Sequence, residues 1–199
     1  MFYSTDKNKH DLKHNPFKAL VAPRPIGWIS TLSGEGVINL APYSFFNGVS
    51  DVPPFVMFSS AGAKDSLRNI EQTGEFVCSL ATYALKDQMN KTSAGVGPEI
   101  DEMKLAGLTP AASALVKPPR VAESPVALEC THYKTIPLPA SETTQHDGYI
   151  MVIGRVVGIY VDDSVITDGL VDVTKIRPIA RLGYMDYAVV DSVFSMDRP

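Results

Sequence analysis

Short runs of β-branched and aromatic residues, separated by Gly, Pro, Ser and Asn, dominate the hydrophobic pattern of this chain. Runs of this length and composition predict strands. We expect strands at 26–32, 37–41, 55–60, 75–81, 126–134 and 148–163, with a final β segment within 176–190. Gly154 and Gly158 interrupt the longest run, and glycines inside a strand predict bulges or sharp bends.

Three other segments predict helices. Residues 64–74 place Leu67 and Ile70 three apart and end at Gly74; residues 82–91 begin with Thr82, a possible N-cap, and residues 100–107 end at a glycine. Because helices do not alternate regularly with strands, a parallel doubly wound sheet is disfavoured. The pattern favours a mainly β fold, a small antiparallel barrel with a few inserted helices.

The segment NLAPYSFFNGVSDVPP, residues 39–54, breaks this pattern between two predicted strands. Small side chains let a backbone approach a ligand closely, and hydroxyls and amides offer it hydrogen bonds. We interpret the segment as a connection that contacts a flat, phosphorylated cofactor.

The amino-acid composition indicates which classes of binding partner to expect. The chain has 199 residues, 45% of them hydrophobic and 20% charged, with a net charge of −4. Its Lys and Arg residues are scattered, so we expect no nucleic-acid partner. No apolar run is long enough to span a membrane, and the polar N-terminal segment lacks the apolar core of a secretory signal. We therefore expect a cytoplasmic protein with no membrane contact.

Familiar catalytic and nucleotide motifs are missing. The sequence contains neither the dinucleotide-binding glycine pattern nor the phosphate-loop lysine motif. His10 and His14 lack a third ligand at suitable spacing, so we expect no metal site, and we interpret His146 and Asp147 as part of a turn.

The two cysteines, Cys78 and Cys130, lie in predicted strands, and we expect buried free thiols. A disulfide or a catalytic thiol remains an alternative. His132 would share a strand face with Cys130.

A phosphate site is indicated near residues 59–66. Ser59 and Ser60 end a predicted strand, and Lys64 precedes a predicted helix whose candidate caps are Asp65 and Ser66. The N-terminus of a helix offers free N–H groups and a partial positive charge, to which a lysine adds a full charge. The alternative, a surface lysine beside an ordinary cap, stays open.

Several stretches together resemble the flavin reductase-like, FMN-binding split-barrel family, in its flavoredoxin-like branch. They are RPIGWIST, GVINLAPYSFFNGVSDVPPFVMFS, KDSLRNIEQTGEFVCSL, LAGLTPAASALVKPPRVAESPVALEC, YIMVIGRVVGI and IRPIARLGYMDY, in this order along the chain. The resemblance begins near Pro16, which implies an N-terminal extension at 1–15 and one domain at 16–199. It implies a Greek-key split β-barrel, a homodimer, and FMN near the subunit interface.

The resemblance also implies roles for individual residues. Around the ribityl phosphate it places Thr31, Ser60, Lys64 and Arg24. Along the flavin ring, largely through the backbone, it places Ala41, Pro42, Tyr43, Ser44 and Asn47, with Trp28 near or under the ring.

The activity implied is hydride transfer from NADH or NADPH to the isoalloxazine ring, which requires no catalytic side chain. Reduced flavin would then serve a partner oxygenase or another electron acceptor. One feature departs from the family: many reductases carry an Asp-His pair before the long late strand, where this chain has Gly148 and Tyr149. The alternative is therefore a flavoredoxin-like FMN electron carrier without efficient NAD(P)H oxidation. A split barrel that binds haem or a pyridoxal-type phosphate, and a purely structural β domain, also remain open.

Overall fold

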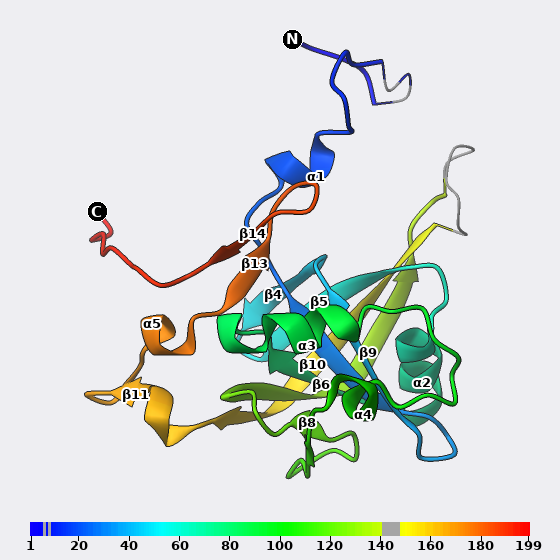
Figure 1. Ribbon diagram of the computed structural model, residues 1–199, viewed down its shortest axis with the longest axis vertical. Helices are drawn as coiled ribbons and strands as arrows, with labels where there is room; N and C mark the ends of the chain where they lie inside the picture. The colour runs from blue at the N-terminus through cyan, green and yellow to red at the C-terminus, as the bar shows by residue number, and fades with distance from the viewer. Residues whose placement is uncertain (6, 8, 141–147) are drawn as a thin grey trace.

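The main element of the fold is an antiparallel sheet, seen in a computed structural model that describes residues 1–5, 7, 9–140 and 148–199. Seven strands form it, in the spatial order β3 (Ile38–Tyr43), β2 (Gly27–Leu32), β6 (Glu75–Leu80), β9 (Val126–Pro137), β10 (Tyr149–Val161), β5 (Pro54–Ala61) and β4 (Phe46–Asp51). The mainly β prediction is confirmed, and the sheet curves strongly in Figure 1.

Smaller elements surround this sheet. A three-stranded sheet joins β1 (Arg24–Pro25), β13 (Ile179–Arg181) and β14 (Tyr187–Val189), and two short ribbons pair β7 (Pro110–Ala111) with β8 (Arg120–Val121) and β11 (Ile166–Thr167) with β12 (Leu170–Val171). The helices are α1 (Phe17–Leu20), α2 (Asp65–Thr73), α3 (Lys86–Lys91), α4 (Glu102–Ala106) and α5 (Val173–Ile176), with 3-10 turns η1 (Tyr83–Leu85) and η2 (Asp163–Val165). In Figure 1, α1 lies with β13 and β14 at the end of the molecule away from α4.

Strand β2 is the centre of the core because both of its faces are buried. Successive side chains on a strand point to opposite faces. Trp28 therefore packs in one cluster with Met89 of α3 and Met103 of α4, whereas Ile29 packs in a second cluster with Phe58 and other residues of the barrel. Trp28 Nε1 donates a hydrogen bond to Thr92 Oγ1 (2.9 Å), which satisfies its one polar group.

The glycine bulges predicted in the long strand are confirmed. The β9–β10 register shifts between Ile153 and Gly154 and again between Val156 and Gly158. At the first shift the ring of Phe76 occupies the space of the missing side chain, since a Cβ on Gly154 would lie 2.2 Å from Phe76 Cζ. The bulge thus lets an aromatic ring pack directly against the strand backbone.

Residues 39–54 do not form an open connection. Residues 38–43 belong to β3, and residues 46–51 form β4, which pairs with β5 through Phe46 and Phe58. Sequence reasoning missed β4 because it is an edge strand and most of its side chains are exposed, so it lacks hydrophobic alternation. Only Ser44 and Phe45 separate the two strands.

The helix predictions hold with differences at their starts. Gly74 and Gly107 end α2 and α4 in the left-handed conformation, as expected. The segment 82–91 instead begins as a 3-10 turn, and the Thr82 side chain makes no capping hydrogen bond. Neither Asp65 nor Ser66 caps α2, because Lys64 occupies the N-cap position.

A buried carboxylate joins α4 to β3. Glu102 Oε2 accepts a hydrogen bond from the backbone N–H of Leu40 (2.9 Å). Burial raises the pKa of Glu102, and this effect exceeds the lowering by the N–H of Leu40. The charged form of Glu102 therefore pays a desolvation cost in the folded protein.

We expect Gly154→Ala to destabilise the protein by about 1–3 kcal/mol, because its methyl group would overlap the Phe76 ring in a packed core. Urea denaturation measures the free energy of unfolding. Gly34→Ala is the matched control, since a Cβ there meets nothing closer than 3.7 Å. Equal stability of the two variants would show that Phe76 does not fill the bulge.

We also expect Glu102→Gln to change how stability depends on pH. The pKa of Glu102 is higher in the folded than in the unfolded protein, so the folded state binds more protons between the two values. The free energy of unfolding consequently falls as the pH rises through that window. The variant keeps an acceptor for Leu40 and loses this titration, so its stability relative to the parent should be higher at pH 7 than at pH 4.

Urea denaturation at both pH values tests this, with Glu71→Gln, at an exposed position of α2, as the control for removal of charge. A stability difference between Glu102→Gln and the parent that stays constant with pH would contradict the account.

Candidate functional site

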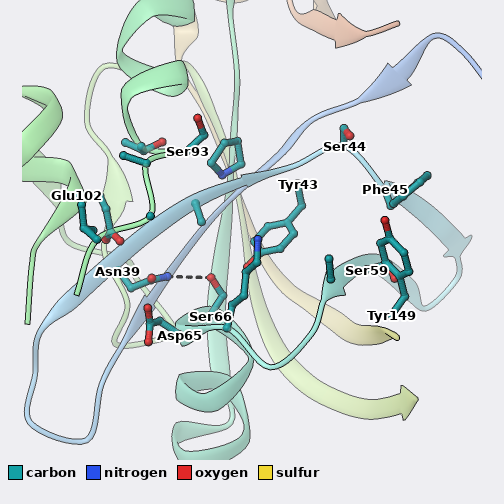
Figure 2. Close-up of a pocket in the computed structure, with 18 of the residues that line it drawn as sticks. Asn39, Tyr43, Ser44, Phe45, Ser59, Asp65, Ser66, Ser93, Glu102 and Tyr149 are labelled. Atoms are coloured by element: carbon teal, nitrogen blue, oxygen red, sulfur yellow. Dashed lines mark hydrogen bonds between the residues drawn. The ribbon is translucent and has the colours of Figure 1, made fainter. Parts of the chain in front are cut away.

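A cavity of about 440 Å³ opens where the end of β3 meets the start of α2. Its size falls within the range of about 300–1,000 Å³ that is typical of small-molecule sites. Its lining comes from residues within 39–45, 59–66 and 92–96, together with Lys18, Glu102 and Tyr149. Figure 2 shows these segments surrounding the space from different sides.

Two buried hydroxyl groups border the cavity without a hydrogen-bond partner among the described residues. They are Tyr43 Oη, at the end of β3, and Ser59 Oγ, near the end of β5. Burial raises the pKa of Tyr43, so its phenol stays protonated at neutral pH. Ser66 and Ser60 lie near enough to oppose that rise, but neither is in hydrogen-bonding geometry with Tyr43 Oη. Both hydroxyls can therefore bind a ligand group.

Lys64 stands at the N-cap of α2 and lines the cavity. It takes part in neither of the two ion pairs found among the described residues, and its side chain does not cap the helix. Asp65 lies next to it but pairs with Arg68. An ammonium group beside a helix N-terminus gives this wall a positive potential, which suits a phosphate.

A buried network of amides and hydroxyls holds this wall in place. Thr31 Oγ1 accepts hydrogen bonds from Asn39 Nδ2 (3.2 Å) and from Asn69 Nδ2 (3.0 Å). Asn39 Nδ2 also donates to Ser66 Oγ (2.9 Å), the contact drawn as a dashed line in Figure 2. The network joins β2 and β3 to α2 and so fixes the helix start beside the cavity.

The opposite end of the cavity is aromatic. The rings of Phe45 and Tyr149 meet edge to face with centroids 5.6 Å apart. Lys18 Nζ lies 6.0 Å from the Phe45 centroid, at the limit of a cation–π contact. Figure 2 shows this aromatic pair at the far end of the site from Glu102 and Asn39.

The structure brings five of the ten residues expected around a flavin to this cavity. All five belong to the end of β3, the following turn or the start of α2: Ala41, Pro42, Tyr43, Ser44 and Lys64. Residues 41–44 are continuous along the chain, and Lys64 precedes a predicted helix, so local sequence features mark both places.

Three other residues expected near the flavin are fully buried and do not line the cavity. Trp28 is fully buried and points toward α3, because the alternation of β2 turns its indole away from the barrel. Thr31 is fully buried within the amide network. Ser60 is also fully buried, and its hydroxyl donates to the carbonyl of Gly62 (2.8 Å).

Arg24 and Asn47 lie elsewhere. The guanidinium of Arg24 donates to the carbonyl oxygens of Lys18, Val21 and Leu182 and lines a neighbouring cavity. Asn47 is exposed on the edge strand β4, and its Oδ1 accepts from the backbone N–H of Gly48 (2.9 Å).

Sequence reasoning did not assign several residues that line the cavity to the site. Outside the stretches 39–54 and 59–66, which were expected near the cofactor, the unassigned lining residues are Lys18, Glu102 and residues 92–96; within those stretches no individual role was given to Asn39, Phe45, Ala61, Asp65 or Ser66 beside the ligand. Ser59 and Ser60 alternate on one strand, so strand geometry decides which of them faces the ligand. The segment 92–96 carried only the signal of a Ser- and Gly-rich loop.

The cysteines are free and buried, as expected, on the neighbouring strands β6 and β9. Burial raises the pKa of the Cys78 thiol, which keeps it protonated. His132 Nε2 lies 2.9 Å from Thr135 Oγ1, and the Cys130 thiol donates to the carbonyl of Leu128. His146 and Asp147 lie outside the described residues.

Within the part of the chain that the structure describes, no group of three His, Cys, Asp or Glu side chains is arranged to hold a metal ion. The same residues include no helix both long and apolar enough to cross a membrane.

Comparison with known proteins identifies the family. The model of the flavin reductase like domain matches residues 20–180. An uncharacterized protein of Aquifex aeolicus is 40% identical over 170 residues, which cover 82% of this chain and 83% of that protein.

Solved structures agree with this assignment. The crystal structure of nitrilotriacetate monooxygenase component B from Bacillus cereus superposes with a TM-score of 0.87 at 32% identity, covering 98% of each chain. Flavoredoxin of Desulfovibrio vulgaris (Miyazaki F) has a TM-score of 0.80 at 24% identity, covering 94% of this chain and 96% of its own, which shows a shared fold. The expected mainly β split-barrel fold is thereby confirmed. The chain belongs to the flavin reductase-like, FMN-binding family.

Proposed function

We propose that this protein is an FMN-dependent oxidoreductase that accepts hydride from NADH or NADPH onto a flavin held in the cavity beside α2. One observation carries the proposal. The cavity presents two buried hydroxyls, Tyr43 Oη and Ser59 Oγ, next to the ammonium of Lys64, and none of the three groups has a hydrogen-bond or ion-pair partner among the described residues. A ligand with both hydrogen-bonding edges and a phosphate satisfies all three groups.

The residues present fit FMN in chemistry. Lys64 and the first N–H groups of α2 give this end of the cavity a positive potential. A phosphate suits it because the phosphate supplies the balancing negative charge. Ala41 and Pro42 have short side chains, so a flat ring can approach the backbone of β3. Tyr43 and Ser59 supply hydroxyls for the polar atoms of the ring or the ribityl chain.

FMN, when bound, supplies the hydride chemistry through its isoalloxazine ring. The protein itself would bind the flavin and orient it. Lys64 would neutralise the phosphate, the hydroxyls of Tyr43 and Ser59 would orient the flavin, and the Phe45–Tyr149 pair forms the aromatic end of the cavity. Positioning of this kind accounts for several kcal/mol of a reaction barrier. No side-chain acid or base is required for hydride transfer itself.

A second candidate is an FMN electron carrier that does not oxidise NAD(P)H efficiently. It is favoured by Tyr149, which lines the cavity where the family resemblance leads us to expect a histidine near the nicotinamide. A tyrosine ring edge to face with Phe45 narrows the space beside the flavin ring.

Two further parts of the proposal concern partners. We infer a homodimer from the family resemblance, and a partner oxygenase as one destination of the electrons. The Bacillus cereus relative, whose name describes it as component B of a monooxygenase, supports the second inference.

We expect Lys64→Ala to weaken FMN binding roughly ten- to a hundredfold, the effect of losing one charged contact to a phosphate. Fluorescence titration of the apoprotein with FMN gives the Kd. Lys134→Ala removes the same charge from an exposed position of β9 that lines neither this cavity nor the one beside Arg24, and it should bind FMN like the parent. Unchanged affinity in Lys64→Ala would place the phosphate elsewhere.

Steady-state oxidation of NADH and NADPH with added FMN tests the activity. The proposal predicts turnover of roughly 1 s⁻¹ or faster with at least one of them, and loss of the visible absorbance of the protein-bound flavin when the reduced nucleotide is added under nitrogen. Binding of FMN without this reaction would favour the electron carrier. A colourless folded protein that takes up no FMN would refute both.

A further inference from the structure

A second cavity, of about 390 Å³, adjoins the proposed flavin site. Lys18, Pro42, Ser44 and Ser93 line both cavities, so the two spaces share a wall. The second cavity lies between the turn after β3 and the strands β13 and β14. A molecule that reacts at the flavin can therefore extend a second part into it.

The lining of this second cavity is positively charged. Lys18, Arg24 and Arg181 contribute to it, and no Asp or Glu of the part of the chain that the structure describes lines it. None of the three cations takes part in the ion pairs found among the described residues. Unopposed cations in a concave site attract an anion.

Arg24 is only 5% exposed, and its guanidinium is fixed. Its two terminal nitrogens donate to the carbonyls of Lys18, Val21 and Leu182, while its Nε is buried and has no partner among the described residues. The charge is thus surrounded by dipoles without a counter-ion, and one N–H group still lacks an acceptor. A buried cation without an anion is costly, and an anionic ligand removes this cost.

Arg181 is held on the other side of the cavity. Its guanidinium carbon lies 4.4 Å from the centroid of the Tyr187 ring, and one of its nitrogens donates to the carbonyl of Tyr184. The pKa of Arg24 is lowered by burial and then by the charge of Arg181, consistent with two guanidinium groups close together. Two fixed guanidinium groups match the oxygens of a phosphate or carboxylate.

The aromatic wall connects this charge to the flavin site. The guanidinium carbon of Arg24 lies 5.8 Å from the centroid of Phe45, the ring that also meets Tyr149 in the first cavity. An anionic group bound at Arg24 and Arg181 would therefore lie just behind the aromatic end of the flavin cavity.

We infer that Arg24 and Arg181 form an oxyanion subsite that binds the pyrophosphate of the hydride donor while its nicotinamide ring enters the flavin cavity. This inference rests on the proposed function for the identity of the donor. The subsite would recognise an oxyanion attached to a redox-active ring. The pyrophosphate of a nicotinamide nucleotide is one such oxyanion, and the carboxylate of an aromatic electron acceptor is the other.

Donors of different length provide the kinetic test. Arg181→Gln should raise KM for NADH roughly ten- to a hundredfold, the effect of losing charged hydrogen bonds. It should change KM less than twofold, or about 0.4 kcal/mol, for N-benzyl-1,4-dihydronicotinamide, which has no phosphate. Arg181→Lys should recover part of the loss because it restores the charge.

Arg120→Gln is the matched control. Arg120 also stacks on a tyrosine, with its guanidinium carbon 3.7 Å from the Tyr160 centroid, but it lines neither cavity. Its KM for NADH should equal that of the parent. An equal rise of KM for both donors in Arg181→Gln, or no rise for NADH, would overturn the inference.

Calorimetric titration with inorganic pyrophosphate tests anion binding at the subsite independently of catalytic activity. It is done with both the FMN-loaded protein and the apoprotein. The parent should bind pyrophosphate, and Arg181→Gln should bind it at least about tenfold more weakly. Arg24→Lys, which keeps the charge without the fork of donors, should also bind it more weakly. If the parent oxidises neither nicotinamide nucleotide but shows this binding, the proposed function fails and the oxyanion subsite stands.

Titration with benzoate distinguishes the two sources. Binding of benzoate that depends on Arg181, with no binding of pyrophosphate, would overturn the dinucleotide and assign the subsite to an aromatic carboxylate. Binding of neither anion would overturn the subsite altogether.

Discussion

A buried hydroxyl that lacks a hydrogen-bond partner costs a protein about 1–3 kcal/mol, and two such groups, on Tyr43 and Ser59, face one cavity in this fold. They come from β3 and β5, which stand at opposite ends of the strand order, first and sixth of seven. The curvature of the sheet brings these two strands to the same space. The cavity thus lies where the barrel is split, and its unsatisfied groups are the strongest indication of what fills it.

The rest of the structure keeps this wall rigid. Thr31, Asn39, Asn69 and Ser66 connect two strands to the first turn of α2 through buried hydrogen bonds. Glu102 ties α4 to β3 by accepting from the N–H of Leu40. Side chains whose own rotamers are fixed by packing hold a ligand with less loss of entropy on binding. Thr31, which we expected to touch the flavin phosphate, thus lies within the buried network that connects these elements.

Much of the fold was readable from the sequence, and the reasons are specific. The long Val- and Ile-rich run of β10 predicted the strand, and its two glycines predicted the bulges, because a glycine inside a strand often marks a bulge. Strand β4 was not predicted, since an exposed edge strand has no apolar face to detect. Among the residues given individual roles beside a flavin, those that line the cavity are residues 41–44, which are continuous along the chain, and Lys64.

Residues contributed by distant segments were not predictable in the same way. Residues 92–96 reach the cavity only through tertiary packing, and their Ser- and Gly-rich composition predicted no more than a loop. Thr31 and Ser60 were expected in contact with the ligand because a hydroxyl near a strand end suits a phosphate. Their burial depends on which strand face turns inward, which one strand alone does not decide. Arg24 illustrates the same limit, since its partners are backbone carbonyls as far away as Leu182.

The turn at Ser44 and Phe45 borders both cavities. Ser44 lines both of them, and Phe45 lines the first. The two-residue turn between β3 and β4 can therefore separate a flavin from the charged part of a second substrate. The edge strand β4, which follows the turn, pairs with β5 and so anchors the turn to it.

A crystal structure of the protein grown with FMN tests the central claim most directly. The account predicts a flavin in the cavity beside α2, with its polar atoms within hydrogen-bonding distance of Tyr43 Oη and Ser59 Oγ and its phosphate on Lys64. A flavin bound elsewhere, with both hydroxyls still unpartnered, would contradict it.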